Sequence, residues 1–203
     1  MAQIGMRQLK FWPITTPRVE GSAITYGDPV VLSPAMSANI SYDISDNEDR
    51  GDDVVIHSDD GINGYNIAME IDDITPEGRV ACLGWTEIKD SSTPPKVISV
   101  RATDATPPEG GLSYIRKLEL EDKTIAWEPF FCHVVKCSSG GENTETMRRN
   151  REWRHQTMNA RGLGAYLDSS GEVAWFDSYR FDTLAKAEAY INTMAGYTPP
   201  NNG

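Results

Sequence analysis

Two segments of the chain alternate apolar and polar residues with a period of two. In residues 36–45 the apolar positions are Met36, Ala38, Ile40, Tyr42 and Ile44, and in residues 65–72 they are Tyr65, Ile67, Met69 and Ile71. Successive side chains of a β-strand point to opposite sides of the sheet. The period therefore predicts two strands, each with one buried face and one wet face.

The segment between these strands is mostly charged. Residues 46–53 hold the carboxylates of Asp46, Glu48, Asp49, Asp52 and Asp53. Such a segment is costly to bury and contains residues that favour turns. It predicts a projecting loop over 46–53, followed by a short strand over Val54–His57.

Capping signals predict two helices. Thr75 as N-cap before Pro76 is typical of a helix start, and Gly84 is typical of a helix end. A second helix is expected over Thr183–Ala195, with Asp182 as its N-cap. Its apolar stripe consists of Leu184, Ala187, Ile191 and Met194.

The most aromatic strand is expected in a hairpin formed by Leu112–Leu120 and Thr124–Lys136. It carries Trp127, Phe130 and Phe131 and is expected to anchor the core. Val97–Ala102 is expected to form a strand between two loops, Thr86–Pro95 and Ala105–Gly111, because paired prolines exclude a helix there.

The composition fits one soluble globular domain over residues 1–203, mainly β with α. Hydrophobic residues make up 39% of the chain and charged residues 24%, a balance that differs from disordered and membrane-spanning chains. No segment approaches the roughly 20 apolar residues of a membrane helix, and the N-terminus lacks the apolar run of a secretory signal. We therefore expect synthesis in the cytoplasm.

Two possible metal motifs have plainer interpretations. Cys132, His133 and Cys137 lack a fourth ligand at zinc-site spacing, and the cysteines also fit small buried hydrophobic residues. The segment from Asp59 to Glu70 resembles a calcium loop, but Gly61 stands where an oxygen ligand is needed, so a hairpin turn fits better. No metal or cofactor is expected.

Catalytic motifs are equally weak. Adjacent carboxylates on a strand point to opposite faces, which argues against a glycosidase pair at Asp52-Asp53 or Asp72-Asp73. The histidines lack a neighbouring serine or cysteine in a nucleophile context, and no phosphate-binding loop occurs. The sequence therefore predicts no catalytic residues.

The net charge of −11 makes the protein repel phosphate backbones. An acidic wall would let DNA slide past without being held, and an acidic surface also serves solubility. Both interpretations remain open.

Residues 148–154 form a basic cluster around one tryptophan: Arg148, Arg149, Arg151, Trp153 and Arg154. Aromatic rings among basic groups are typical of single-stranded nucleic-acid binding. In an acidic protein the cluster also fits contact with the acidic segment 46–53 of another copy, or an ordinary solvated face.

The ends of the chain carry a family resemblance. The chain opens with Ile4-Gly5-Met6-Arg7-Gln8-Leu9-Lys10-Phe11-Trp12-Pro13-Ile14, turns through Tyr26-Gly27-Asp28-Pro29, and closes with Trp175-Phe176-Asp177 and the helix after Phe181. Together with the strand at 36–45, the turn at 59–61 and the helix after Thr75, these segments resemble, in order, the major tail proteins (tail tube proteins) of long-tailed bacteriophages. The resemblance covers most of the chain as a pattern, and it favours a strand over Met147–Ala160.

The resemblance implies a β-sandwich or barrel-like tail tube fold, flanked by one short and one C-terminal helix. Such proteins assemble as hexameric rings stacked into a tube, so the chain would form an acidic conduit for genome delivery. The residues expected to line the lumen are Ser37, Asn39, Ser41, Asp43, Asn66, Glu70 and Asp72. Contacts between subunits or rings are expected from the N-terminal arm 1–14 with Phe11 and Trp12, from the loop 46–53, and from the basic cluster.

The same resemblance implies the partners and the location. The expected partners are other copies of the chain, the tape measure, terminator and distal tail proteins, and DNA in transient passage without tight binding. No membrane is expected. The protein would be assembled in the host cytoplasm and reside in the tail of the virion.

Other classes remain open. A monomeric β-sandwich module that binds carbohydrate or protein would use Trp85 or Trp175, and it predicts a stable monomer with a saturable ligand. A carboxylate hydrolase would lose activity when one acidic pair is removed. Another tail component of similar fold, such as a tail terminator, is also open.

Overall fold

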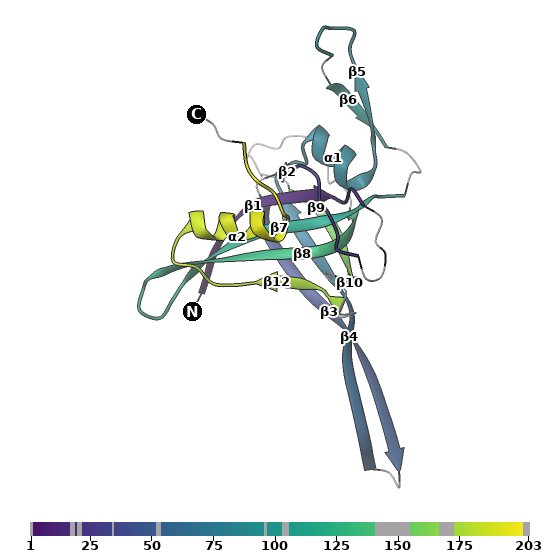
Figure 1. The fold of residues 1–203 in the computed structure, drawn as a ribbon, viewed down its shortest axis with the longest axis vertical. Coiled ribbons are helices and arrows are strands. Elements are labelled where there is room, and N and C mark those ends of the chain that lie inside the picture. The colour runs from purple at the N-terminus through teal and green to yellow at the C-terminus, as the bar shows by residue number, and fades with distance from the viewer. Residues whose placement is uncertain are drawn as a thin grey trace, which may run out of the picture.

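The computed structural model describes residues 2–16, 19, 22–33, 35–51, 54–95, 97–102, 106–140, 155–166 and 173–200. These residues form a mostly β structure with two helices, one short and one C-terminal, in a sandwich-like arrangement of sheet (Figure 1). The fold class predicted from the sequence is confirmed.

Strands dominate the described residues from end to end. The strands are β1 (Ala2–Pro13), β2 (Val30–Ser33), β3 (Ala35–Gly51), β4 (Val54–Ile71), β5 (Thr86–Lys89), β6 (Val97–Arg101), β7 (Glu109–Glu119), β8 (Ile125–Ser139), β9 (Gln156–Leu163), β10 (Ala165–Tyr166), β11 (Val173–Ala174) and β12 (Phe176–Ser178). The helices are α1 (Pro76–Leu83) and α2 (Leu184–Met194).

One large antiparallel sheet organises the molecule. Its strand order is β2-β1-β7-β8-β9-β4-β3. β12 pairs with residues 130–132 of β8, on the same edge of β8 that β9 pairs with further along. β1 and β3 stand far apart in the strand order, yet they come into contact. The sheet must therefore curve strongly. The enclosed side holds the larger core, to which β1, β4, β7, β8 and β9 all contribute buried side chains.

Helix α1 closes one end of this core for the reasons that the sequence predicts. The Thr75 hydroxyl accepts a hydrogen bond from the Gly78 amide at 3.0 Å, and Pro76 occupies the first turn. Gly84 ends the helix in the left-handed region at φ 71°, where glycine is favoured. Cys82 and Leu83 then enter the larger core.

Helix α2 covers the other side of the sheet over β1, β7 and β8. Ala187 and Ile191 pack on Trp12, Ile115 and Phe131, which form a second, smaller core. The expected stripe is therefore correct. The cap is one residue later than expected, because the hydroxyl of Thr183, and not Asp182, accepts the hydrogen bond from the Lys186 amide.

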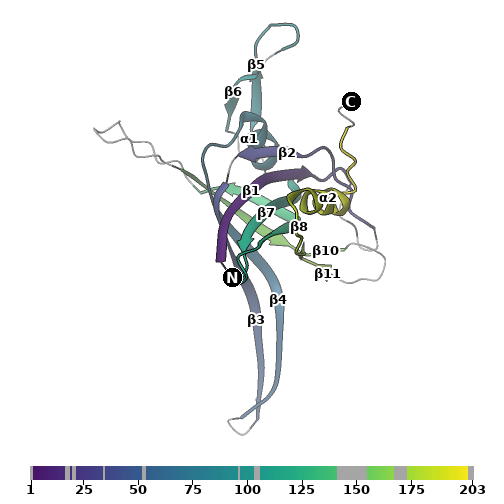
Figure 2. The same cartoon turned by 90° about the vertical axis from the view of Figure 1, so that its left-hand side faces the viewer.

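The loop predicted over 46–53 is wrong for residues 46–51, which lie in β3, and residues 52 and 53 lie outside the described residues. The β3–β4 ladder continues from Asp46 opposite Asp60 to Gly51 opposite Val54, and it forms the long hairpin that projects from the body in Figures 1 and 2. Pairing across the hairpin satisfies the backbone amides and carbonyls, so a charged composition alone does not prevent a strand. The predicted short strand at Val54–His57 belongs to the same β4 as the strand at 65–71.

Further expectations about loops and strands change. Thr86–Lys89 is a strand, β5, that pairs with β6, so the predicted loop at Thr86–Pro95 begins only after Lys89. The strand expected at Met147–Ala160 begins at Gln156, and residues 147–154 lie outside the described residues. The predicted hairpin at 112–136 is confirmed as β7 and β8, but β7 begins at Glu109, so the loop predicted over Ala105–Gly111 is wrong at its last three residues.

Candidate functional site: an open polar face of the sheet

A polar face extends across β3, β4 and β9 on the side of the sheet away from the larger core. Register places Ser37 opposite Glu70 and Ser41 opposite Asn66. The described residues that share this exposed face are Ser37, Asn39, Ser41, Asp43, Asn66, Ala68, Glu70, Thr157, Asn159 and Arg161. The predicted polar residues of β3 and β4 thus form one surface.

The opposite side of the same strands is buried. Ile67 and Ile71 are 0% exposed, and Met69 and Met158 also lie in the larger core. The alternation that predicted one wet face and one dry face is confirmed at these strands. Asp72 follows the end of β4 and is exposed, and its Oδ1 lies 3.9 Å from Nδ1 of His155.

The sequence prediction missed how far this face extends. β9 continues it with Thr157, Asn159 and Arg161, which alternate with the buried Met158 and Ala160. The period of two is visible in residues 157–161, but the arginine-rich residues before it obscure where the strand begins. β8 adds two further polar positions, Lys136 opposite Arg161 and Ser138 opposite Asn159.

The charge of the described face is mixed. Two carboxylates, Asp43 and Glu70, share it with the guanidinium of Arg161, and Asp72 is exposed just beyond the end of β4. Lys136 is paired with Glu109 at 3.3 Å. Hydroxyl and amide side chains occupy most of the remaining positions, so the face is polar with a small negative excess.

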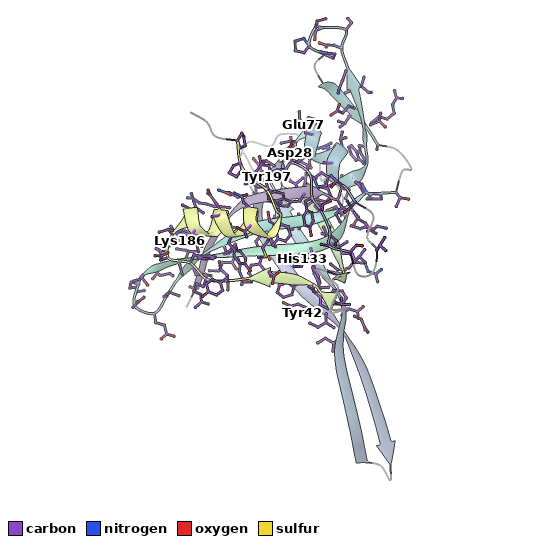
Figure 3. The ribbon with its side chains drawn as sticks, in the orientation of Figure 1. Asp28, Tyr42, Glu77, His133, Lys186 and Tyr197 are labelled. Atoms are coloured by element: carbon purple, nitrogen blue, oxygen red, sulfur yellow. The ribbon has the colours of Figure 1, made fainter. Side chains whose placement is uncertain are left out.

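The apolar side of β3 and β4 continues outward onto the projecting hairpin. Tyr65 is 1% exposed, its cross-strand partner Tyr42 is 47% exposed, and Ile44 and its partner Ile62 are 59% and 42% exposed. Figure 3 shows Tyr42 where the hairpin leaves the body, and its ring stacks on Phe176 at a centroid distance of 6.1 Å. The described part of the chain thus leaves an apolar stripe uncovered at the root of the hairpin.

The expected contact residues have different outcomes. Phe11 and Trp12 are 0% exposed and belong to the two cores, and β1 lies between β2 and β7 in the sheet. The N-terminal segment is therefore not a free arm, and these two side chains are not available for contacts with another subunit. Both are large apolar side chains whose burial stabilises this chain.

The charged contact residues are only partly placed. The backbones of Asp46, Glu48 and Asp49 lie in β3 on the projecting hairpin. The other expected contact residues, Asp52, Asp53, Arg148, Arg149, Arg151, Trp153 and Arg154, lie outside the described residues.

One buried histidine–carboxylate pair was not foreseen. Nε2 of His133, which is 2% exposed, lies 2.7 Å from Oδ2 of Asp177, and Nδ1 has no hydrogen-bond partner among the described residues. Burial lowers the pKa of His133, and the Asp177 carboxylate opposes this in part. The pairing of β12 with β8 brings the two residues together, and no local pattern of the sequence predicts it.

The thiols are chemically quiet. Burial raises the pKa of Cys132 to about 12, and a hydrogen bond with Cys82, together with burial, raises the pKa of Cys137. Thiols held protonated are poor nucleophiles and poor metal ligands. Within the described ranges, no three residues of the His, Cys, Asp and Glu types are grouped as a metal site requires.

No family model matches the chain, and no curated protein matches it. Neither helix of the described structure is long and apolar enough to cross a membrane.

Proposed function

We propose that this chain is a structural subunit of a phage tail tube, in which copies join into hexameric rings that stack around a conduit for DNA. The observation that supports this most is the open polar face on β3, β4 and β9. It is broad, exposed and built on well-paired strands, and its other side is the core of the molecule. A closed ring of such sheets would turn this face inward as the wall of a channel.

The free edge of β3 supports the same proposal. In the described structure β2 and β3 end the strand order, and β3 is 17 residues long with β4 as its only sheet neighbour. Long unpaired edges readily pair with another chain. Pairing of the β3 edge of one copy with the β2 side of the next would be a head-to-tail contact, which closes into a ring and removes the edges.

The uncovered apolar stripe of the hairpin fits this arrangement. Tyr42, Ile44 and Ile62 would be covered by the neighbouring copy, and burial of their exposed surfaces would stabilise the ring. The mixed polar wall would hold DNA weakly, since few basic side chains face the channel to bind phosphates. The partners proposed are the tape measure, terminator and distal tail proteins, and the location is the tail of the virion.

Hydrogen exchange across a concentration series tests this assembly. We expect the amides of β3 between residues 35 and 43 to become protected as the concentration rises, because their free edge pairs with another copy. β9 is the control within the same chain, because it already has β4 and β8 as neighbours and should be protected throughout. Exchange in β3 that does not depend on concentration would contradict edge pairing.

A monomeric binding module has less support. Trp85 and Trp175 are both partly buried against the larger core. The guanidinium of Arg79 lies 5.2 Å from the Trp85 ring centroid, and Trp175 contacts Tyr65 at a centroid distance of 6.3 Å. Neither ring is a free platform for a ligand. A tail terminator would form a ring that does not stack, and the length of the assemblies distinguishes it from a tube subunit.

A further inference from the structure

A cluster of two cations and one tryptophan lies on the side of the sheet that carries α2. The guanidinium carbon of Arg7 on β1 is 5.6 Å from the ring centroid of Trp127 on β8, and Nζ of Lys117 on β7 is 5.7 Å from it. Lys117 and Trp127 are direct cross-strand partners near the β7–β8 turn. We call these three residues the Trp127 cluster.

The charges of this cluster are not neutralised within the described structure. Neither Arg7 nor Lys117 has a described carboxylate within ion-pair distance. Other basic residues of the same region are paired: Arg116 with Glu128 at 2.6 Å, Lys123 with Glu119 at 2.8 Å and Lys186 with Asp182 at 2.8 Å. The Trp127 cluster is also partly exposed, so a carboxylate from outside the chain can reach it.

The projecting hairpin has the opposite charge. Its register places Asp46 opposite Asp60 and Asn47 opposite Asp59, with Glu48 next along β3. By sequence, residues 46–60 hold seven acidic residues and a single arginine. Cations on another surface would therefore complement the charge of this segment.

We propose that the Trp127 cluster is the docking site for the acidic part of the β3–β4 hairpin of a neighbouring copy. The proposal rests on the assembly of copies proposed above and assigns one of its contacts. In Figure 1 the hairpin leaves the body at the lower right, whereas the β7–β8 turn lies at the left. The contact is therefore between two copies and joins different surfaces, as a ring or a stack of rings requires.

The chemistry of the cluster suits carboxylates. A cation that lies over an aromatic ring can still donate its outward-pointing N–H groups to other partners, and the ring restricts the motion of the long side chain. Arginine and lysine then donate charge-assisted hydrogen bonds to carboxylates that the acidic segment supplies. Contacts of this kind set which surfaces meet and how fast they associate, and they weaken with salt.

Two charge-reversed full-length variants test the contact by rescue. The first is Arg7→Glu with Lys117→Glu, and the second is Asp46→Lys with Asp60→Lys. Self-association is measured by light scattering over a concentration series, at low and high salt. The control is Lys89→Glu, a single reversal of charge on β5, where the side chain is 52% exposed.

We expect each reversed variant alone to need roughly tenfold or more protein to associate at low salt, because two charge contacts become repulsive. An equal mixture of the two should associate like the wild type, since each cluster then meets a hairpin of opposite charge. Lys89→Glu should be unchanged. In the wild type, carbodiimide should also cross-link Lys117 to residues 46–60 of an isotopically distinct copy.

Two results overturn the docking site while leaving the tube proposal intact: a first variant that associates normally, or a mixture that does not restore association. The docking site is also overturned if the cross-links between wild-type copies never involve Lys117 or residues 46–60. This test uses the wild type alone, so it does not depend on whether a variant folds. A wild type that stays monomeric at every concentration overturns the tube proposal, and the docking site with it.

Discussion

Substitution of Gly162 by alanine should destabilise the fold strongly, because an aromatic ring lies directly over this glycine. Gly162 on β9 is the cross-strand partner of Tyr65 on β4. A Cβ atom at Gly162 would lie 2.1 Å from Cε1 and Cζ of the Tyr65 ring and 2.4 Å from Cε2. These distances are far below van der Waals contact, so the ring must move.

The Tyr65 ring has little freedom to move. It is 1% exposed, its hydroxyl donates a hydrogen bond to the Trp175 carbonyl at 3.2 Å, and it contacts the rings of Trp175 and Phe176. Overpacking of a core costs about 1–3 kcal/mol. Loss of the buried hydroxyl's partner costs about 1–3 kcal/mol. Relief of the backbone entropy of glycine returns about 0.5–1 kcal/mol, so the net loss should be about 1–5 kcal/mol.

The assay is urea unfolding of Gly162→Ala against Gly5→Ala. Gly5 lies in β1 of the same sheet, and a Cβ atom added there would meet nothing within 4 Å. Its substitution should therefore change the free energy of unfolding by less than about 0.5–1 kcal/mol. In a Tyr65→Ala background the cost of Gly162→Ala should largely disappear. Equal effects of the two glycine substitutions, or an unchanged cost without the Tyr65 ring, would refute the reasoning.

Three further predictions follow from single contacts. Thr75→Ala should lower the free energy of unfolding by about 1 kcal/mol, because the N-cap of α1 is lost, whereas Thr75→Ser should retain most of it. Burial lowers the folded-state pKa of His133, so as the pH falls the unfolded chain takes up a proton on this side chain at a higher pH than the folded chain does. The free energy of unfolding should therefore be intact above about pH 6.5 and fall as the pH drops below it. His133→Gln should reduce this part of the pH dependence in thermal unfolding, and a variant with the full wild-type slope would contradict the assignment. If the polar face lines a DNA channel, Asp43→Lys with Glu70→Lys should impair genome ejection; unaffected tube assembly and ejection together would remove these residues from the lumen.

The parts of the fold that the sequence predicted are those controlled by local rules. The alternation at residues 36–45 and 65–71 predicted the two-faced strands, because one side of a sheet must meet the core and the other side water. The capping residues of α1 predicted its start and its end, because they satisfy backbone groups of the first and last turns.

The failures come from long-range contacts. The composition of the acidic segment 46–53 predicts a loop, yet the backbone of residues 46–51 pairs across the hairpin with residues 54–60. Phe11 and Trp12 were expected on an exposed arm, and the packing of β1 between β2 and β7 buries them. The His133–Asp177 pair depends on the register of β12 against β8, which no local pattern encodes.

Negative-stain electron microscopy of the purified full-length protein over a concentration series, with mass from light scattering on the same samples, tests the central claim most directly. The account predicts a mass that grows with concentration and rings or hollow tubes of uniform width. A protein that remains a strict monomer at the highest concentration would contradict the claim that this chain assembles through its own sheet edges, and would favour the monomeric binding module.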